Sequence, residues 1–220
     1  MGKGSELSDV KGVFAACELR QVSLADGLEA DWGLETLLGR FVEVSSAGST
    51  AALTVVVRVM LEAQQRGELA AWVTSQTSIF FPPDLAACGV DLRSLPVVRV
   101  EKPYEVVKSA ETLLRSGGFA LVVIDLGMQQ SMSLAVQTRL AGLARRYQAV
   151  LLALTRKQSH CSSLGSLVAV RVESSRQRSG FSWFECALKI LRDKRSQHGR
   201  NSRRNPTRRL DRCRGPDDLC

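Results

Sequence analysis

Short apolar runs alternate with longer segments whose apolar residues recur at helical spacing through the middle of the chain. The short runs predict strands: FVEVSS at 41–46, LAAWVTS at 69–75, VVRVEK at 97–102, FALVVIDLG at 119–127 and AVLLALT at 149–155. The longer segments predict helices, and they cover residues 50–67, 82–89, 103–117 and 132–148. Regular alternation of strand and helix favours an α/β fold with a mostly parallel sheet flanked by helices.

The pattern changes after residue 156. KQSHCSSLGS at 157–166 predicts a loop, and two alternating runs follow at 166–175 and 181–193, joined through RQRSG. Two such runs close together predict a C-terminal antiparallel hairpin. The length suits one core domain. We place three parts along the chain: an N-terminal segment or helix at 1–34, the core at 35–195 and a flexible basic tail at 196–220.

The net charge of +8 is concentrated at the C-terminus. From Arg192 to Cys220 there are ten Lys and Arg against four Asp, or +6, which leaves +2 for residues 1–191. Few apolar residues accompany these charges, so we expect a flexible arm that binds DNA without sequence preference. A solubilising tail and a grip on an acidic protein surface are the alternatives. The DNA-binding candidates of the arm are Arg192, Lys194, Arg195, Arg200, Arg203, Arg204, Arg208, Arg209, Arg212 and Arg214.

Six scattered cysteines, with no C-x-x-C pair, predict neither a disulfide framework nor a zinc site. His160 and Cys161 are adjacent, but one pair without further ligands is more typical of an exposed loop than of a metal site. No run approaches eighteen apolar residues, so we expect no membrane span. The scattered cysteines, the expected lack of a membrane span and the predicted DNA-binding arm together favour a cytoplasmic, nucleoid-associated protein.

The stretch SAGSTAAL at 46–53 lies between a predicted strand and a predicted helix, where a phosphate-binding loop would lie. Such a loop needs the pattern G-x-x-x-x-G-K-[ST], because backbone N–H groups, the lysine and the hydroxyl hold phosphates and magnesium. Here Ser46 and Ala51 replace the glycines, Ala52 replaces the lysine and Leu53 replaces the hydroxyl residue. Only Ser49, Thr50 and the helix start would attract an anion, so we expect no cofactor beyond weak Mg-ATP binding.

Asp125 ends the apolar run LVVID, which is the position of a carboxylate that braces magnesium. Its structural alternatives are to cap the following turn or to pair with Arg156 at the end of the next strand. Because Leu53 offers no partner hydroxyl, we favour a structural role.

Several segments resemble bacterial RecA recombinases in order and spacing over about residues 35–195. They are GRFVEV at 39–44, AQQRG at 63–67, LLRSG at 113–117, LVVID at 121–125 and ALKILRDK at 187–194. The resemblance implies a RecA-like core. In RecA-like folds the loops after the last parallel strands face DNA, so Lys157, Arg176 and Arg178 join the DNA-binding candidates, with His160 nearby.

The departures from RecA agree with one another. Gln76 stands where RecA has its catalytic glutamate and cannot act as a carboxylate base. Arg156 stands where RecA has the glutamine that senses the γ-phosphate. Together with the altered phosphate loop, these residues indicate a RecA-type core that has lost nucleotide hydrolysis.

A chain of this kind is similar to the ImuA family, degenerate RecA homologues of damage-induced mutagenesis. That resemblance implies an accessory role in translesion DNA synthesis, with ImuB, an error-prone DnaE-type polymerase or RecA as partners. RecA relatives assemble head to tail, so a homo-oligomer is a further expectation. Residues 8–21 would then serve as a docking helix, or else pack on their own core.

Two other functions are consistent with the sequence. One is a slow, DNA-stimulated ATPase in which Asp125 holds magnesium and Arg156 or a neighbouring subunit supplies the basic residue. Candidates for such a contribution are Lys189, Arg192 and Lys194. The other is an inhibitor that, like SulA, acts by protein binding alone and has no affinity for DNA.

Overall fold

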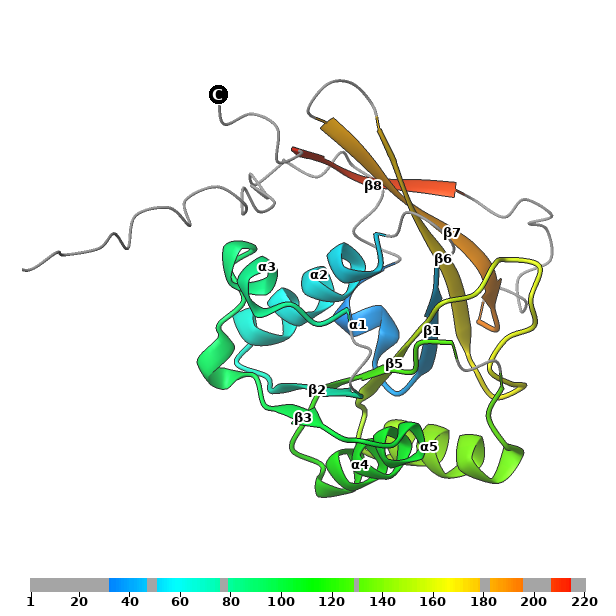
Figure 1. Cartoon of the computed structure of the whole chain (residues 1–220). Helices are drawn as coiled ribbons and strands as arrows, with labels where there is room; N and C mark the ends of the chain where they lie inside the picture. Colours follow the sequence, from blue (N-terminus) through cyan, green and yellow to red (C-terminus); the bar gives the residue numbers. More distant parts are fainter. Residues whose placement is uncertain are drawn as a thin grey trace, which may run out of the picture.

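The computed structural model describes residues 32–46, 51–75, 79–128, 131–178, 183–195 and 207–214. Eight strands are present in this part of the chain: β1 (Phe41–Ser45), β2 (Ala70–Thr74), β3 (Val97–Arg99), β4 (Leu121–Asp125), β5 (Val150–Thr155), β6 (Val170–Arg178), β7 (Trp183–Asp193) and β8 (Thr207–Arg214). They form one sheet in the order β3-β2-β4-β5-β1-β6-β7-β8 (Figure 1). The pairs from β3 to β6 are all parallel, whereas β7 and β8 pair antiparallel to their neighbours.

Helices cover both faces of the parallel part of the sheet (Figure 1). The helices of the described residues are α1 (Leu34–Leu37), α2 (Ala52–Gln65), α3 (Pro82–Ala87), α4 (Pro103–Ser116) and α5 (Leu134–Arg146), with a short 3-10 turn η1 (Leu92–Ser94). Helices α1, α2 and α3 lie over one face, and α4 and α5 lie over the other. The hydrophobic core therefore has two halves, one around Trp72 and one around Phe41.

The central strands consist of continuous apolar runs because both of their faces are covered. Every residue of β1, β2, β4 and β5 is buried. Local signals set the helix ends. Pro103 opens α4, whose C-cap Gly117 has a φ of +69° that suits glycine. The Ser133 hydroxyl accepts a hydrogen bond from Val136 N–H and so caps α5.

The predicted fold class is confirmed: a mostly parallel sheet flanked by helices, with an antiparallel hairpin formed by β6 and β7. The predicted helix at residues 8–21 lies outside the described residues. Within the described residues, no helix is long and apolar enough to cross a membrane.

Within the segment expected to be a flexible tail, Thr207–Arg214 form the edge strand β8. Residues of β8 pair with β7 from Trp183 opposite Arg214 to Lys189 opposite Thr207. The segment cannot fold alone, but an existing strand edge offers backbone hydrogen bonds that need no apolar core. Composition does not reveal that edge, so the sequence argument missed the pairing.

Candidate functional site

The nucleotide-site candidates lie along the carboxyl edge of the parallel sheet. Ser45 of β1 is opposite Thr155 of β5, and Asp125 of β4 is opposite Leu154 of β5. Ligands of parallel α/β sheets bind at this edge, beyond the strand ends. The structure therefore brings Ser46, Asp125 and Arg156 to one edge. The other candidates from neighbouring loops, Ser49, Thr50 and Gln76, lie outside the described residues.

The side chains at the start of α2 pack into the core. Ala52, which stands in the place of the lysine, has 2% of its surface exposed, and Leu53 packs against the same cluster. The N-cap residue Ala51 makes no side-chain cap hydrogen bond. Ser46 is buried, and its N–H donates to the Thr155 carbonyl at 3.1 Å. None of these four residues carries a positive charge that would hold a phosphate.

Both oxygens of the Asp125 carboxylate accept hydrogen bonds from backbone N–H groups. Its Oδ2 accepts from the N–H of Ile79 at 2.9 Å, and its Oδ1 accepts from the N–H of Gly127 at 3.1 Å. The side chain is 4% exposed. Asp125 thus caps the turn after β4 and also holds the chain that follows β2, as expected for a structural carboxylate.

Arg156 does not pair with Asp125. Its backbone N–H donates to the Gly127 carbonyl at 2.7 Å, while its side chain is exposed and takes part in none of the ion pairs between described residues. Of the two structural roles considered for Asp125, the turn cap is therefore the one present.

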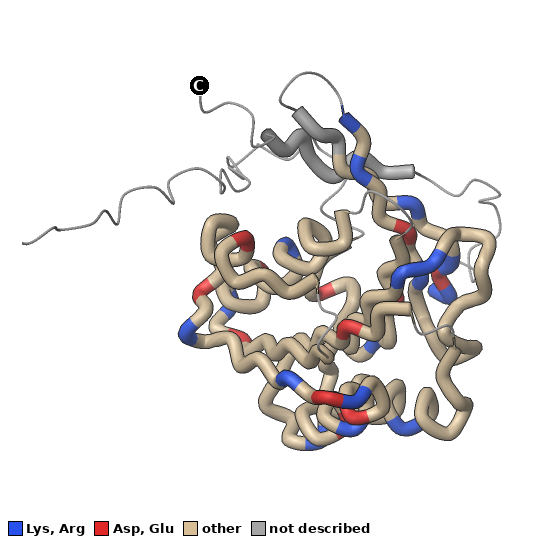
Figure 2. Tube along the Cα trace, in the orientation of Figure 1, with Lys and Arg blue, Asp and Glu red and all other residues tan. Residues whose placement is uncertain are grey.

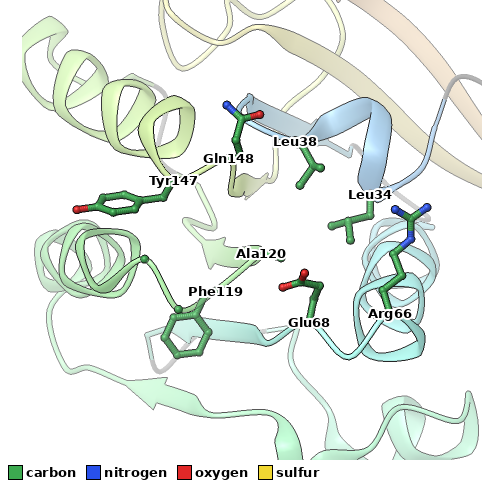
Figure 3. A pocket seen from close by; sticks show the side chains of 10 residues that line it. Leu34, Leu38, Arg66, Glu68, Phe119, Ala120, Tyr147 and Gln148 are labelled. Carbon is green, nitrogen blue, oxygen red and sulfur yellow. The ribbon is translucent and has the colours of Figure 1, made fainter.

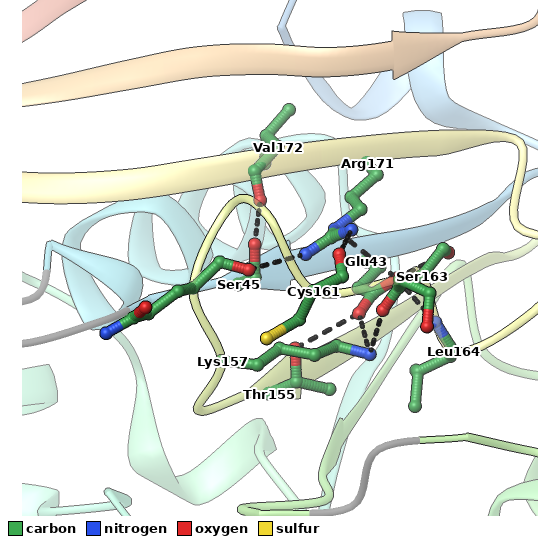
Figure 4. Close-up of polar contacts among 11 residues, drawn as sticks. Glu43, Ser45, Thr155, Lys157, Cys161, Ser163, Leu164, Arg171 and Val172 are labelled. Atoms are coloured by element: carbon green, nitrogen blue, oxygen red, sulfur yellow. Dashed lines mark hydrogen bonds and ion pairs between the residues drawn. The ribbon is translucent and has the colours of Figure 1, made fainter.

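A buried carboxylate, Glu43, lies at the centre of β1 and was not among the candidates (Figure 4). Its Oε1 is 2.8 Å from Lys157 Nζ and accepts from the Thr155 hydroxyl at 3.2 Å. Its Oε2 accepts from the Ser163 hydroxyl at 2.6 Å and from Leu164 N–H at 2.9 Å. Four partners therefore surround one carboxylate away from solvent, which is the environment a buried charge requires.

The cations of this cluster hold the backbone of the loop after β5 (Figure 4). Lys157 Nζ donates to the Ser162 carbonyl at 3.0 Å. Arg171 on β6 donates to the carbonyls of Gln158 and Cys161, and its Nε lies 3.9 Å from Glu43 Oε2. The loop carbonyls are thus satisfied by buried charges rather than by a strand or helix.

The structure places Lys157, one of the DNA-binding candidates, inside the fold rather than on an exposed loop. Its side chain is 1% exposed, and its charge is paired with Glu43 inside the fold. The sequence did contain a signal, because FVEV places one carboxylate in a strand predicted to be buried on both faces. Such a carboxylate needs a buried cation. The run itself does not identify that cation, because Lys157 is 114 positions away in the chain.

A buried amide fastens the other side of the same loop to α5. Gln137 Nε2 donates to the Met132 carbonyl at 2.6 Å, and its Oε1 accepts from Leu167 N–H at 2.9 Å. A Cβ added at Gly165 would lie 1.9 Å from Gln137 Nε2, so a larger residue there would displace this buried amide. The loop is therefore braced from β1, β6 and α5.

The other DNA-binding candidates divide between the two ends of the antiparallel ribbon of β6, β7 and β8. Arg176 and Arg178 are exposed at the C-terminal end of β6. Figure 2 shows Lys and Arg (blue) at several points along the described part of the ribbon. Arg192, Lys194 and Arg195 lie at the opposite end of β7, beside the start of β6. Strand β8 pairs along β7 in the same ribbon. It contains four of the candidates: Arg208, Arg209, Arg212 and Arg214. The remaining candidates lie outside the described residues: Arg200, Arg203 and Arg204.

Lys194 is half-buried and bonds to backbone carbonyls of the core. Its N–H donates to the Ala169 carbonyl, and its Nζ lies 2.5 Å from the Ser166 carbonyl oxygen. Burial, and then repulsion from Arg192, lowers the pKa of Lys194. The neighbouring Asp193 forms an ion pair with Arg40. This end of β7 is thus a junction with β1 and the braced loop.

His160 is exposed beside the half-buried Cys161. In the described part of the chain, no three side chains of His, Cys, Asp or Glu gather into a set that could hold a metal ion.

Comparison with known proteins identifies the family. A model of the RecA N-terminal domain matches residues 20–161. Protein RecA of Rubrobacter xylanophilus is 34% identical over 87 residues, which is 40% of this chain and 25% of that protein. Protein RecA of Clostridium acetobutylicum is 32% identical over a stretch of the same length and coverage.

A longer match extends over most of the chain. Protein RecA of Chlorobium limicola is 27% identical over 184 residues, which is 82% of this chain and 49% of that protein. The chain spans about half or less of the length of the curated relatives it matches. The family model covers well over half of the chain, and the chain therefore belongs to the RecA N-terminal domain family.

Proposed function

We propose that this chain is a non-enzymatic accessory protein of DNA repair, built on a RecA-type core that no longer uses ATP. One observation carries the proposal. At the corner between β1 and α2, the positions of the lysine and the hydroxyl hold Ala52 and Leu53, which pack into the core. A RecA-type frame without its phosphate-holding side chains is suited to binding macromolecules rather than to hydrolysis.

The state of Asp125 supports the same proposal. A carboxylate that braces magnesium must direct its oxygens at the metal or its waters. Both Asp125 oxygens instead accept backbone N–H bonds. The alternative of a slow, DNA-stimulated ATPase would require the remaining lone pairs of these oxygens to face a metal ion or its waters. Phosphate release that depends on DNA and disappears in Asp125→Ala would favour that alternative.

DNA contact is proposed for the outer end of the ribbon. Arg176 is opposite Cys186, which in turn is opposite Asp211, and Arg178 is aligned in the same way with Phe184 and Cys213. Arg212 and Arg214 of β8 are therefore at the same end as the two β6 arginines. Directly opposite residues share a face of a sheet, so the register puts these two β8 arginines on the other face of the ribbon from the two β6 arginines. Arginines at both faces of one projecting end are suited to contacting phosphates without reading bases.

The finer role we propose is that of the ImuA family in damage-induced translesion synthesis. ImuB, an error-prone DnaE-type polymerase and RecA are the proposed partners, and the core rather than the ribbon would contact them. The family match and the altered nucleotide corner support this role. No cofactor is part of the proposal.

Binding of arbitrary DNA by a four-arginine variant tests the interface. Arg176, Arg178, Arg212 and Arg214 are changed to Gln in the full chain, and affinity is measured by fluorescence anisotropy across a salt series. If all four meet phosphates, the slope of log K against log salt should fall in magnitude by about 3 to 4.

The matched control changes four exposed arginines of the core, Arg93, Arg115, Arg139 and Arg145, to Gln. It alters the net charge by the same amount, so the slope should keep most of its wild-type value. Equal losses in both variants would show that net charge, and not the ribbon, determines binding. Absence of DNA binding by the wild type would favour an inhibitor that acts by protein contact alone.

A further inference from the structure

A cavity of about 230 Å³ opens at the amino-terminal edge of the parallel sheet, opposite the edge of the nucleotide candidates (Figure 3). Its lining residues directly precede the strands: Glu68 lies before β2, Ala120 before β4 and Gln148 before β5. The volume suits one long side chain or a small ligand rather than a cofactor.

Apolar side chains form part of the cavity wall, beside the polar lining residues Arg66, Glu68 and Gln148. Leu34 and Leu38 form one side, and Phe119 and Tyr147 form the other (Figure 3). A Cβ added at Gly117 would lie 2.8 Å from Tyr147 Cδ1, so the chain turns in direct contact with the tyrosine ring. The aromatic wall is therefore fixed by backbone packing.

One solvent-exposed carboxylate lines the cavity without a partner among the described residues. The Glu68 carboxylate points into the space (Figure 3), and none of the hydrogen bonds or ion pairs among the described residues involves it. The lining residue Arg66 is paired with Glu35 at 3.2 Å. Nearby Arg115 is paired with Glu111 at 2.6 Å, and Arg146 lies over the Tyr147 ring at 5.4 Å.

Three helices also end at this cavity. Helices α2, α4 and α5 are followed at once by the lining residues Arg66, Gly117 and Tyr147. Each helix C-terminus carries a partial negative charge from its carbonyl groups. These carbonyls and the Glu68 carboxylate together favour a cation in the cavity.

The geometry points to a socket for one arginine side chain, presented by a basic segment of another protein. The apolar stem of arginine would lie against the leucines and Phe119, as such stems do on apolar surfaces. Its guanidinium would reach Glu68 and the carbonyls near the helix ends, where five fixed donors match several acceptors. Lysine would match the charge but has no planar fork of donors to present to the Glu68 carboxylate.

Titration by NMR tests the socket in the full chain. The probes are the capped pentapeptide Ac-Gly-Gly-Arg-Gly-Gly-NH2 and versions with lysine or citrulline, the neutral isostere of arginine. The arginine peptide should shift the amide signals of Gly117, Gly118 and Ala120, with a dissociation constant of order 1 mM for one anchoring side chain. The lysine peptide should bind more weakly, and the citrulline peptide should give no saturable shift.

Two variants give the contrast. Glu68→Gln should weaken the arginine peptide about fivefold, as for one solvent-accessible ion pair, while leaving the spectrum of the fold unchanged. Glu101→Gln, at an exposed carboxylate on the far edge of the sheet, should have no effect. Equal binding of the citrulline peptide, or full affinity in Glu68→Gln, would overturn the socket, as would the absence of saturable shifts. Equal binding of the lysine peptide would overturn the preference for arginine.

Discussion

Glu43, Lys157 and Arg171 place three formal charges beside one another inside the fold. Removing ions from water costs several kcal/mol each, and the cost is offset only when partners and hydrogen bonds surround them. Every one of these groups contacts the backbone or a hydroxyl of the loop after β5. At the scale of single residues, the cluster therefore orders a loop that has little secondary structure of its own.

Removing the Lys157 charge should reveal the free-energy cost of burying the Glu43 carboxylate. We expect Lys157→Met to lower the free energy of unfolding by about 3–5 kcal/mol, because Glu43 loses its closest charge. Adding Glu43→Gln should recover at least about 1 kcal/mol, since the remaining amide needs no counter-ion. Urea unfolding of both variants measures these differences.

The control for that experiment is Arg66→Met, which breaks an exposed pair with Glu35. It should cost less than about 1 kcal/mol. A similarly small loss of unfolding free energy in Lys157→Met would contradict the role given to the buried pair. So would a double variant whose loss equals the sum of two large single losses.

Two glycines should respond in opposite directions to the same substitution. Gly165→Ala puts a methyl group against the Gln137 amide and should cost about 1–3 kcal/mol. Gly142 lies on the exposed face of α5, and a Cβ added there would meet no neighbouring atom within 4 Å. Gly142→Ala should therefore stabilise the helix by about 0.5–1 kcal/mol. Thermal unfolding compares the two. A neutral result for Gly165→Ala would mean that the Gln137 amide is not fixed.

At the scale of elements, a basic segment of the chain forms β8, the strand at one edge of the sheet. Arginines on an edge strand keep it from pairing with other chains, because like charges repel and hold water. The same residues give the ribbon the charge that the proposed DNA contact needs. One strand thus serves both the boundary of the sheet and the proposed interface.

Hydrogen exchange tests the strand directly. In an antiparallel strand, alternate N–H groups point to opposite neighbours, so every second amide of β7 from 183 to 189 should bond to β8. Deleting residues 207–220 should speed exchange at that alternate set and leave the amides directed at β6 protected. Unchanged exchange along β7 would show that β8 does not pair in solution.

The elements differ in how far the sequence predicts them. Strands β1, β4 and β5 are predicted well because a strand buried on both faces must be a continuous apolar run. Strand β3 was predicted to reach Lys102 but ends at Arg99, since Lys102 is already the N-cap of α4 and its N–H donates to Glu105. Helix α1 has only four residues, too few to show a helical period.

The candidate site is predicted less completely than the fold. The changes at Ala52 and Leu53 are visible because a short motif fixes the expected residues. The partner of Glu43 and the tie between Gln137 and the loop are not visible, since both join residues that are far apart in the chain. The loop position and charge that put Lys157 among the DNA-binding candidates did not reveal that its side chain is buried.

At the scale of the whole molecule, the two edges of the parallel sheet have different characters. The carboxyl edge keeps the frame of a nucleotide site, but its carboxylate is bound to backbone groups and its corner is apolar. The amino edge holds the cavity with an unpaired Glu68. The antiparallel ribbon extends from one side of this core (Figure 1). These features are the basis of the proposed accessory role.

Calorimetric titration of the full chain with Mg-ATP tests the central claim most directly. A phosphate site without its lysine and hydroxyl should show no saturable heat up to about 1 mM nucleotide, which corresponds to a binding free energy weaker than about −4 kcal/mol. Asp125→Ala should give the same trace. A micromolar dissociation constant for Mg-ATP that is lost in Asp125→Ala would contradict the account.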